Sequence, residues 1–140
     1  MKIGELSARS GVQVETIRYY EAQGLLQAAA RASNNYRDYD EGHAARLAFI
    51  QRCRSLDLSQ ADIRGLITLQ DEPSCGCERV DDVLDRHLAQ VSARIAELQA
   101  LREELERIRH ACAAPGRVAD CRALASLNFA TAVGPDASLR

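Results

Sequence analysis

Apolar residues at steps of seven run through the second half of this 140-residue chain. The repeat positions, with the apolar residues that flank them, are Leu84, Leu88, Val91, Ile95, Leu98, Leu101, Leu105 and Ile108. This spacing is typical of a coiled-coil seam. Cys77 precedes the repeat, Cys112 follows it, and Pro115 with Gly116 then ends the helical pattern. The sequence therefore predicts one long helix that buries its seam against a second helix.

The two end cysteines restrict how that second helix packs. A helix rises about 1.5 Å per residue, so Cys77 and Cys112 lie roughly 50 Å apart within one chain. If two copies pack antiparallel about an axis near Arg94 and Ile95, Cys77 of one chain faces Cys112 of the other. The loop after Cys112 returns to Cys121, so that two thiols of one chain and one of its partner can converge at each end of a homodimer.

Composition limits the classes of protein that this chain can represent. Residues Met1 to Leu6 lack the apolar core of a signal peptide, and no apolar run approaches the ~20 residues of a membrane helix. We therefore expect a cytoplasmic protein without membrane contact, whose five cysteines serve as metal ligands or reactive thiols rather than disulfides. The sequence holds no catalytic triad, carboxylate pair or phosphate loop, so an enzyme is not expected.

The net charge of −2 gives no support to DNA binding, because nucleic-acid-binding domains are often more basic. Local pattern has to carry that inference. Ile3, Leu6 and Ala8 predict a short amphipathic helix, Gly11 lies at its break, and a second helix runs from about Val14 to Gly24. Two short helices about a glycine turn are typical of a helix-turn-helix, although many other helical proteins begin in the same way.

The residues after this helix pair predict a wing and further helices. Asn34 and Asn35 indicate a tight turn between two very short strands. Asp40 is a candidate cap of the following helix, whose core face we expect to comprise Ala45, Phe49, Cys53 and Leu56. Ser59 and Asp62 form a capping-box pattern before the next helix, which ends near Asp71–Pro73. A short helix from Arg122 to about Asn128 and a frayed tail follow.

With these parts in order, the chain resembles the MerR family of transcription regulators over nearly its whole length. The resemblance is carried by residues 3–6 (Ile-Gly-Glu-Leu), 14–21 (Val-Glu-Thr-Ile-Arg-Tyr-Tyr-Glu), 24–26 (Gly-Leu-Leu) and 35–39 (Asn-Tyr-Arg-Asp-Tyr), and by Cys77, Cys112 and Cys121. Residues 52–59 are most similar to the cadmium- and lead-responsive branch, the CadR and PbrR types.

This resemblance implies a mainly α fold with three parts. They are a winged helix-turn-helix DNA-binding domain over residues 1–72, a long antiparallel coiled-coil dimerisation helix over residues 73–112, and a C-terminal metal-binding loop, short helix and tail over residues 113–140. It also implies a homodimer on double-stranded promoter DNA that represses without metal, and that activates RNA polymerase with metal by distorting the DNA.

The resemblance and the thiol chemistry together imply the inducer. Copper(I)-type members lack a thiol at the position of Cys77, which favours a divalent ion. Zinc-type members carry a second thiol beside the one matching Cys112, where this chain has Ala113. Three thiolates favour soft ions, so we expect cadmium or lead at Cys77, Cys112 and Cys121, with mercury or zinc as alternatives. Cys75 is either a bystander or an occasional fourth donor.

The resemblance also indicates residues that contact DNA, on the second helix and on the wing. These are Thr16, Arg18, Tyr19, Tyr20, Arg31, Asn35, Tyr36 and Arg37. For each the alternative is a solvated side chain or, for one of Tyr19 and Tyr20, core packing. We expect Cys53 to be a core residue and His87 a polar residue of the dimer interface. Two rival functions are a redox-sensing regulator of the same fold and a metal-buffering protein without DNA binding.

Overall fold

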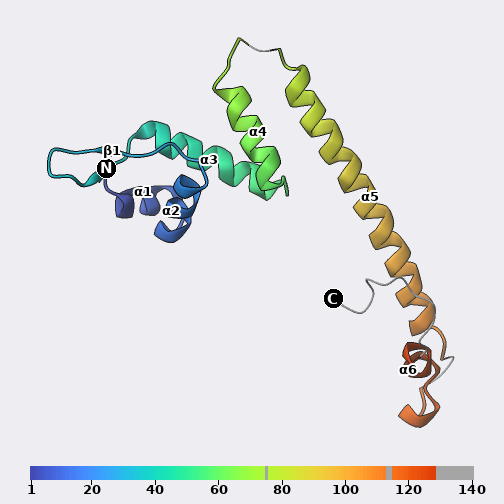
Figure 1. Cartoon of the computed structure of the whole chain (residues 1–140). Helices are drawn as coiled ribbons and strands as arrows, with labels where there is room; N and C mark the ends of the chain where they lie inside the picture. Colours follow the sequence, from blue (N-terminus) through green and yellow to red (C-terminus); the bar gives the residue numbers. More distant parts are fainter. Residues whose placement is uncertain (75, 113–114, 129–140) are drawn as a thin grey trace. The chain divides into compact units, whose positions relative to one another are not determined.

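The computed structural model describes residues 1–74, 76–112 and 115–128 (Figure 1). The elements in chain order are α1 (Ile3–Ser10), α2 (Val14–Ala22), β1 (Ala30–Arg31), β2 (Arg37–Asp38), α3 (Glu41–Ser55), α4 (Gln60–Gln70), α5 (Glu78–Arg109), the 3-10 helix η1 (Val118–Asp120) and α6 (Arg122–Leu127). The predicted mainly helical fold is confirmed. Two compact units divide the chain between His87 and Leu88. Among the described helices, none is both long and apolar enough to cross a membrane.

The turn between α1 and α2 forms where the sequence predicted it. Gly11 has a φ of 74°, which L side chains rarely adopt, and its N–H donates to the Ser7 carbonyl oxygen at 2.9 Å. The hydroxyl of Ser7 donates to the carbonyl oxygen of Val12 at 2.6 Å and closes the turn. Leu6 of α1 and Ile17 of α2 are fully buried, so the two helices pack through their apolar faces.

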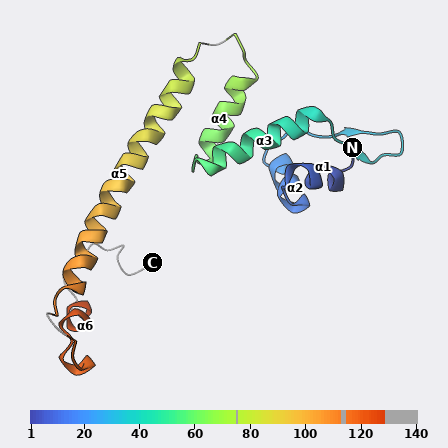
Figure 2. The same ribbon diagram turned by 180° about the vertical axis from the view of Figure 1, so that it is seen from behind.

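The predicted hairpin is confirmed as an antiparallel pair of two-residue strands. Ala30 pairs with Asp38, and Arg31 pairs with Arg37. In the turn between them, Asn35 has a φ of 67°, and its N–H donates to the Ala32 carbonyl oxygen at 2.8 Å. Figures 1 and 2 show the hairpin loop projecting away from the helices of the first unit.

Both predicted helix caps are present. The Asp40 side chain accepts a hydrogen bond from the His43 N–H, and the His43 ring accepts one from the Asp40 N–H, which completes a capping box. The Ser59 hydroxyl oxygen accepts a hydrogen bond from the Asp62 N–H at 3.1 Å and caps α4.

The predicted core face of α3 is wrong in part. Cys53 is buried, but the other buried apolar residues of α3 are Leu47 and Ile50, whereas Ala45 and Leu56 are exposed. The reason is that α3 has two apolar stripes. Its second stripe, with Phe49 and Leu56, lines an apolar groove of about 470 Å³ that α4 and the first turns of α5 complete.

The first turns of α5 lie beside the helices of the first unit. The Arg86 guanidinium pairs with the Asp62 carboxylate of α4 at 2.8 Å. The Nε2 atom of His87 lies 2.7 Å from the carbonyl oxygen of Leu56, at the end of α3. Within one chain the His87 ring therefore already contacts the end of α3, and its place in the dimer interface stays a prediction.

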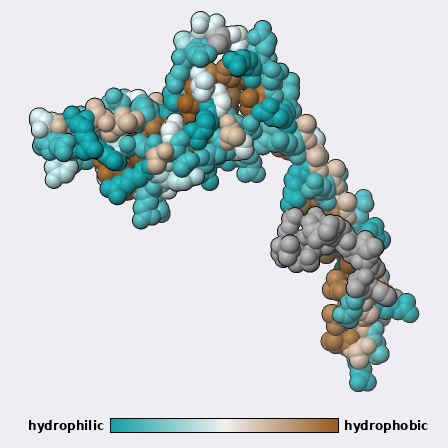
Figure 3. All heavy atoms as spheres, viewed as in Figure 1, coloured by the Kyte–Doolittle hydropathy of each residue, from teal (hydrophilic) through white to brown (hydrophobic). Residues whose placement is uncertain are grey.

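Among the residues that the structure describes, the buried ones all lie in the first unit. Its core comprises Leu6, Val12, Ile17, Tyr20, Leu25, Leu26, Tyr39, Leu47, Ile50, Cys53, Leu58, Ile63, Leu66 and Ile67. In contrast, α5 buries none of its residues, and seven of its seam residues, Leu84 to Leu105, are 40 to 63% exposed. Figure 3 shows apolar side chains open to solvent along the stretch from α5 to α6. A single chain thus leaves its predicted seam uncovered.

Candidate DNA interface and thiol site

Helix α2 presents the predicted recognition residues in three different environments. Arg18 and Tyr19 are exposed, and Thr16 is half-buried. The Tyr19 hydroxyl donates to Gln60 at 3.1 Å. Tyr20 is only 4% exposed, and its hydroxyl oxygen accepts a hydrogen bond from Arg54 at 3.1 Å. The burial of Tyr20 weighs against a contact with DNA and favours the alternative of core packing.

The hairpin exposes all four of its predicted DNA-contact residues, Arg31, Asn35, Tyr36 and Arg37. The Arg31 guanidinium donates to the Asn35 carbonyl oxygen at 3.0 Å, which braces the turn. Tyr36 is 61% exposed, so its ring and hydroxyl are accessible to a ligand.

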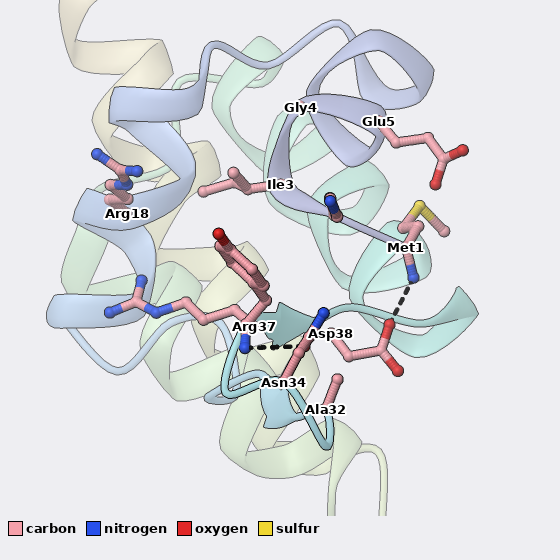
Figure 4. A pocket seen from close by; sticks show the side chains of 11 residues that line it. Met1, Ile3, Gly4, Glu5, Arg18, Ala32, Asn34, Arg37 and Asp38 are labelled. Carbon is pink, nitrogen blue, oxygen red and sulfur yellow. Dashed lines mark hydrogen bonds and ion pairs between the residues drawn. The ribbon is translucent and has the colours of Figure 1, made fainter.

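A pocket of about 880 Å³ lies between the start of the chain, α2 and the hairpin (Figure 4). Arg18 from α2 and Arg37 from β2 extend toward the same edge of this pocket. Lys2 also lines the pocket, and its ammonium lies 5.1 Å from the centroid of the Tyr36 ring. Three side-chain cations thus line an open pocket whose lining also includes the carboxylates of Glu5 and Asp38. Such cations suit a DNA phosphate backbone, although the whole chain carries a net negative charge.

The sequence alone does not single out Lys2 as a residue of this pocket. It precedes the first helix, and nothing in its immediate sequence context indicates that the ammonium reaches Tyr36 on the hairpin 34 residues later. Only the tertiary contact between the start of the chain and the hairpin reveals it.

At the other end of the chain, Cys112 and Cys121 lie together. Their sulfur atoms are 4.0 Å apart. Cys121 caps α6, and its sulfur accepts a hydrogen bond from the Leu124 N–H at 3.4 Å. The backbone N–H groups of Ala123 and Arg122, the latter 3.1 Å from the sulfur, hold the pKa of the Cys112 thiol below its ordinary value. Backbone donors at the start of α6 thus favour a thiolate, the form that binds metal.

The third predicted ligand lies outside this pair in a single chain. Cys77 is exposed just before α5, a helix of 32 residues, and belongs to the first compact unit. Within the described ranges no cluster of three or more Cys, His, Asp or Glu side chains is in place to bind a metal ion. Cys75 lies outside the described residues. One chain therefore brings together two of the three predicted thiols.

Cys53 differs from Cys112 in both burial and thiol pKa. It is buried in the core, and burial raises the pKa of its thiol. Both properties disfavour a reactive thiolate, so the prediction that Cys53 is a core residue is confirmed.

The helix-turn-helix and the hairpin beside it define a winged helix-turn-helix protein, which also carries a long helix with an uncovered apolar seam. Family models agree with this class. A model described as MerR HTH family regulatory protein matches residues 1–70, and one described as MerR, DNA binding, matches residues 44–108. A curated relative, an HTH-type transcriptional regulator ZntR homolog of Haemophilus influenzae, is 46% identical over 109 residues, which cover 78% of this chain and 81% of the relative.

Solved structures give the same result. The transcription regulator PbrR691 from Ralstonia metallidurans CH34, in complex with lead(II), is 43% identical with a TM-score of 0.82, and the match covers 91% of this chain and 98% of that chain. The regulator MerR from Bacillus megaterium MB1, in complex with a mercury(II) ion, is 26% identical with a TM-score of 0.73 and the same coverage. The chain belongs to the MerR family, as one of its metal-responsive transcriptional regulators. It is not an enzyme.

Proposed function

We propose that the chain acts as a homodimer that binds promoter DNA and changes transcription when a soft divalent metal ion binds. Each ion is held by Cys112 and Cys121 of one chain and by Cys77 of the other. The observation that carries this proposal is the 4.0 Å separation of the Cys112 and Cys121 sulfur atoms. A pair of thiols at that distance needs only a modest shift to bind one ion, and a third thiol then completes a trigonal sulfur site.

Cadmium or lead is the inducer that we favour, with mercury and zinc as alternatives. Three thiolates suit large soft ions, whereas structural zinc sites are almost always four-coordinate. The similar structures that contain lead(II) and mercury(II) are consistent with a soft ion. His110 is near Cys112 in the sequence, but within the described residues no His joins Cys112 and Cys121 in a cluster that could bind a metal ion.

The dimer follows from the uncovered seam of α5. Antiparallel pairing about Arg94 and Ile95 buries the exposed leucines and sets Cys77 of one chain opposite Cys112 of the other. This proposal includes the predicted division of the chain into three parts: a DNA-binding domain over residues 1–72, a dimerisation helix over residues 73–112 and a metal-binding end over residues 113–140. It also includes a cytoplasmic location.

The DNA contacts come from Arg18 and Tyr19 of α2 and from the hairpin residues Arg31, Asn35, Tyr36 and Arg37. Guanidinium groups and tyrosine hydroxyls bind phosphates, and Arg18 can also reach a base edge. Thr16 remains a candidate at the edge of this surface. We leave Tyr20 out of the interface because it is buried.

Regulation then works as a two-state switch. Metal ties the start of α5 of one chain to the Cys112–Cys121 end of its partner, and so fixes how the DNA-binding units are held. The dimer represses without metal, and with metal it distorts the promoter into a shape that RNA polymerase can use. A differential binding free energy of about 5.5 kcal/mol moves such a switch from 1:99 to 99:1.

A metal titration tests this function. Reduced, metal-free protein is titrated with cadmium, lead, mercury and zinc, and thiolate-to-metal absorbance is followed for the wild type, Cys77→Ser and the control Cys53→Ser. The proposal predicts saturation at one ion per protomer for the wild type and the control, with loss in Cys77→Ser. An unaffected Cys77→Ser variant would place the site elsewhere.

Family membership removes the metal-buffering alternative, because the chain is a transcription regulator. The redox alternative has one observation in its favour, since Cys112 and Cys121 lie close enough to approach a disulfide after a small movement. Measuring transcription from the promoter in reducing buffer distinguishes the metal-sensing function from the redox-sensing one. A metal sensor responds to added metal while its thiols stay reduced, and a redox sensor responds only to an oxidant.

A further inference from the structure

The hairpin has little structure of its own to fix it against α2. Its strands, Ala30–Arg31 and Arg37–Asp38, have two residues each, and all four residues are exposed. A two-stranded hairpin is at best marginally stable in water. The orientation of the hairpin arginines therefore depends on contacts that the rest of the first unit makes with this segment.

One set of these contacts comes from the start of the chain. The Tyr39 N–H donates to the Met1 carbonyl oxygen at 2.8 Å, and the Lys2 ammonium lies over the Tyr36 ring. These contacts hold the hairpin to the segment before α1, but they do not connect it to α2, where Arg18 lies.

That connection is made by Glu21, near the end of α2. Its side chain is only 12% exposed, and its carboxylate accepts a hydrogen bond from the Tyr39 hydroxyl at 2.5 Å. The second carboxylate oxygen lies 3.9 Å from the Arg37 guanidinium. Burial, together with the hydrogen bond to Glu21, raises the pKa of the Tyr39 hydroxyl, so this group remains a donor at neutral pH.

Arg18 and Arg37 line one open cleft of about 470 Å³, together with Glu21. The Arg37 side chain is 45% exposed. A guanidinium has five N–H donors, so one loose contact with Glu21 leaves most of them available to a ligand. The cleft therefore has two cations at its rim and a carboxylate that restrains one of them.

We propose that Glu21 is a positioning residue for DNA binding, whose carboxylate holds Arg37 beside Arg18 so that the two guanidinium groups bracket one backbone phosphate. The inference rests on the proposed DNA-binding function. A carboxylate this close to a phosphate repels it, so a purely electrostatic view assigns Glu21 the opposite effect. That difference in sign makes the role of Glu21 testable.

The test compares Glu21→Gln with Glu15→Gln. Both variants remove one negative charge from α2, and Glu15 is exposed. Binding to a random-sequence DNA duplex is measured over a range of salt concentrations, because phosphate contacts are independent of sequence. We expect Glu15→Gln to bind as tightly as the wild type or more tightly. Glu21→Gln should bind several-fold more weakly than Glu15→Gln, with a loss of up to about fivefold, because a partly exposed ion pair contributes at most about that much.

The salt dependence and a double variant separate positioning from general destabilisation. Glu21→Gln should reduce the slope of log K against log salt by about one for each DNA-binding unit, whereas Glu15→Gln should not. In an Arg37→Gln background, Glu21→Gln should cause no further loss. If Glu21→Gln fails to fold, Tyr39→Phe takes its place, since it removes the hydroxyl that Glu21 binds, and the same loss of slope is expected.

The inference is overturned if Glu21→Gln and Glu15→Gln bind DNA with the same affinity and the same salt slope. It is also overturned if the losses of Glu21→Gln and Arg37→Gln add in the double variant. Either result leaves DNA binding itself intact. If the wild type does not bind the duplex at low salt, the DNA-binding part of the proposed function fails as well. The two failures are thus distinguishable.

Discussion

The sulfur atoms of Cys112 and Cys121 lie 4.0 Å apart, although the two residues are nine positions apart in the chain. The N–H groups at the start of α6 hold both sulfurs, Arg122 donating to Cys112 and Leu124 to Cys121. The backbone at the start of α6 therefore holds the two thiols close together. Because ligands already held in place lose less conformational freedom on binding, such a pair favours capture of an ion from solution.

The first prediction concerns thiol reactivity. Because backbone N–H groups lower the pKa of the Cys112 thiol, its thiolate persists to lower pH than that of free cysteine. The rate of alkylation by iodoacetamide is followed by peptide mass spectrometry as the pH is raised. For Cys112 this rate should begin to increase at a lower pH than for free cysteine. Cys53 is the internal control, since burial raises its pKa and blocks access. If the alkylation rate of Cys112 increased only at the pH found for free cysteine, or at a higher pH, the hydrogen bonds to its sulfur would be contradicted.

The second prediction concerns the seam of α5. Leu98→Arg places a charge in the middle of the proposed dimer interface, where a buried unpaired charge is costly. We expect the variant to sediment as a monomer. The matched control is Glu103→Arg, an exposed site on the same helix away from the seam. The dimer model would be wrong if the Leu98→Arg variant stayed dimeric at micromolar concentration.

The third prediction concerns the hairpin. Arg37→Ala should weaken binding to all DNA sequences alike and lower the salt slope by about one for each hairpin that contacts DNA. Arg102→Ala on α5 removes the same charge far along the sequence, and it should change neither property. An unchanged slope for Arg37→Ala would remove Arg37 from the phosphate contacts.

The fourth prediction concerns how α5 communicates with the DNA-binding helices. Arg86 at the start of α5 pairs with Asp62 at the start of α4, and Asp62 is largely buried. We expect Arg86→Ala to leave metal affinity unchanged and to reduce metal-dependent transcription several-fold, because it removes a contact through which the two elements move together. In a variant that already carries Asp62→Asn, Arg86→Ala should cause little further loss of metal-dependent transcription. Full activation by metal in Arg86→Ala would exclude this contact from the switch.

Much of the fold follows from local signals in the sequence. Gly11 marks the turn between α1 and α2, Asn35 marks the hairpin turn, and Asp40 and Ser59 cap their helices, because each of these residues satisfies a backbone requirement nearby. The structure places all four where the sequence predicted them. The heptad repeat likewise predicted a helix that leaves apolar residues uncovered within one chain.

Other features depend on tertiary packing and escaped prediction. The core face of α3 could not be chosen, because the helix has two apolar stripes and the sequence does not say which one meets α1. Tyr19 and Tyr20 are adjacent in the sequence, yet only Tyr20 is buried against Arg54. The contacts of Lys2 with Tyr36 and of Glu21 with Arg37 join distant segments, so no local pattern indicates them.

In the proposed dimer, each metal site takes Cys77 from one chain and Cys112 with Cys121 from the other. Mixed dimers of two cysteine variants test this cross-chain arrangement. Cys77→Ser and Cys112→Ser each break both sites of a homodimer. A mixed dimer keeps one intact cross-chain site, made of Cys77 from the Cys112→Ser chain and Cys112 with Cys121 from the Cys77→Ser chain.

The measurement is a cadmium titration of mixed dimers purified through two different affinity tags, alongside both parent homodimers and the wild type. We expect that neither parent binds tightly, and that the mixed dimer regains about half of the wild-type capacity with wild-type affinity, since one of its two sites is whole. A mixed dimer as inactive as its parents would contradict the cross-chain site and place all the ligands within a single chain.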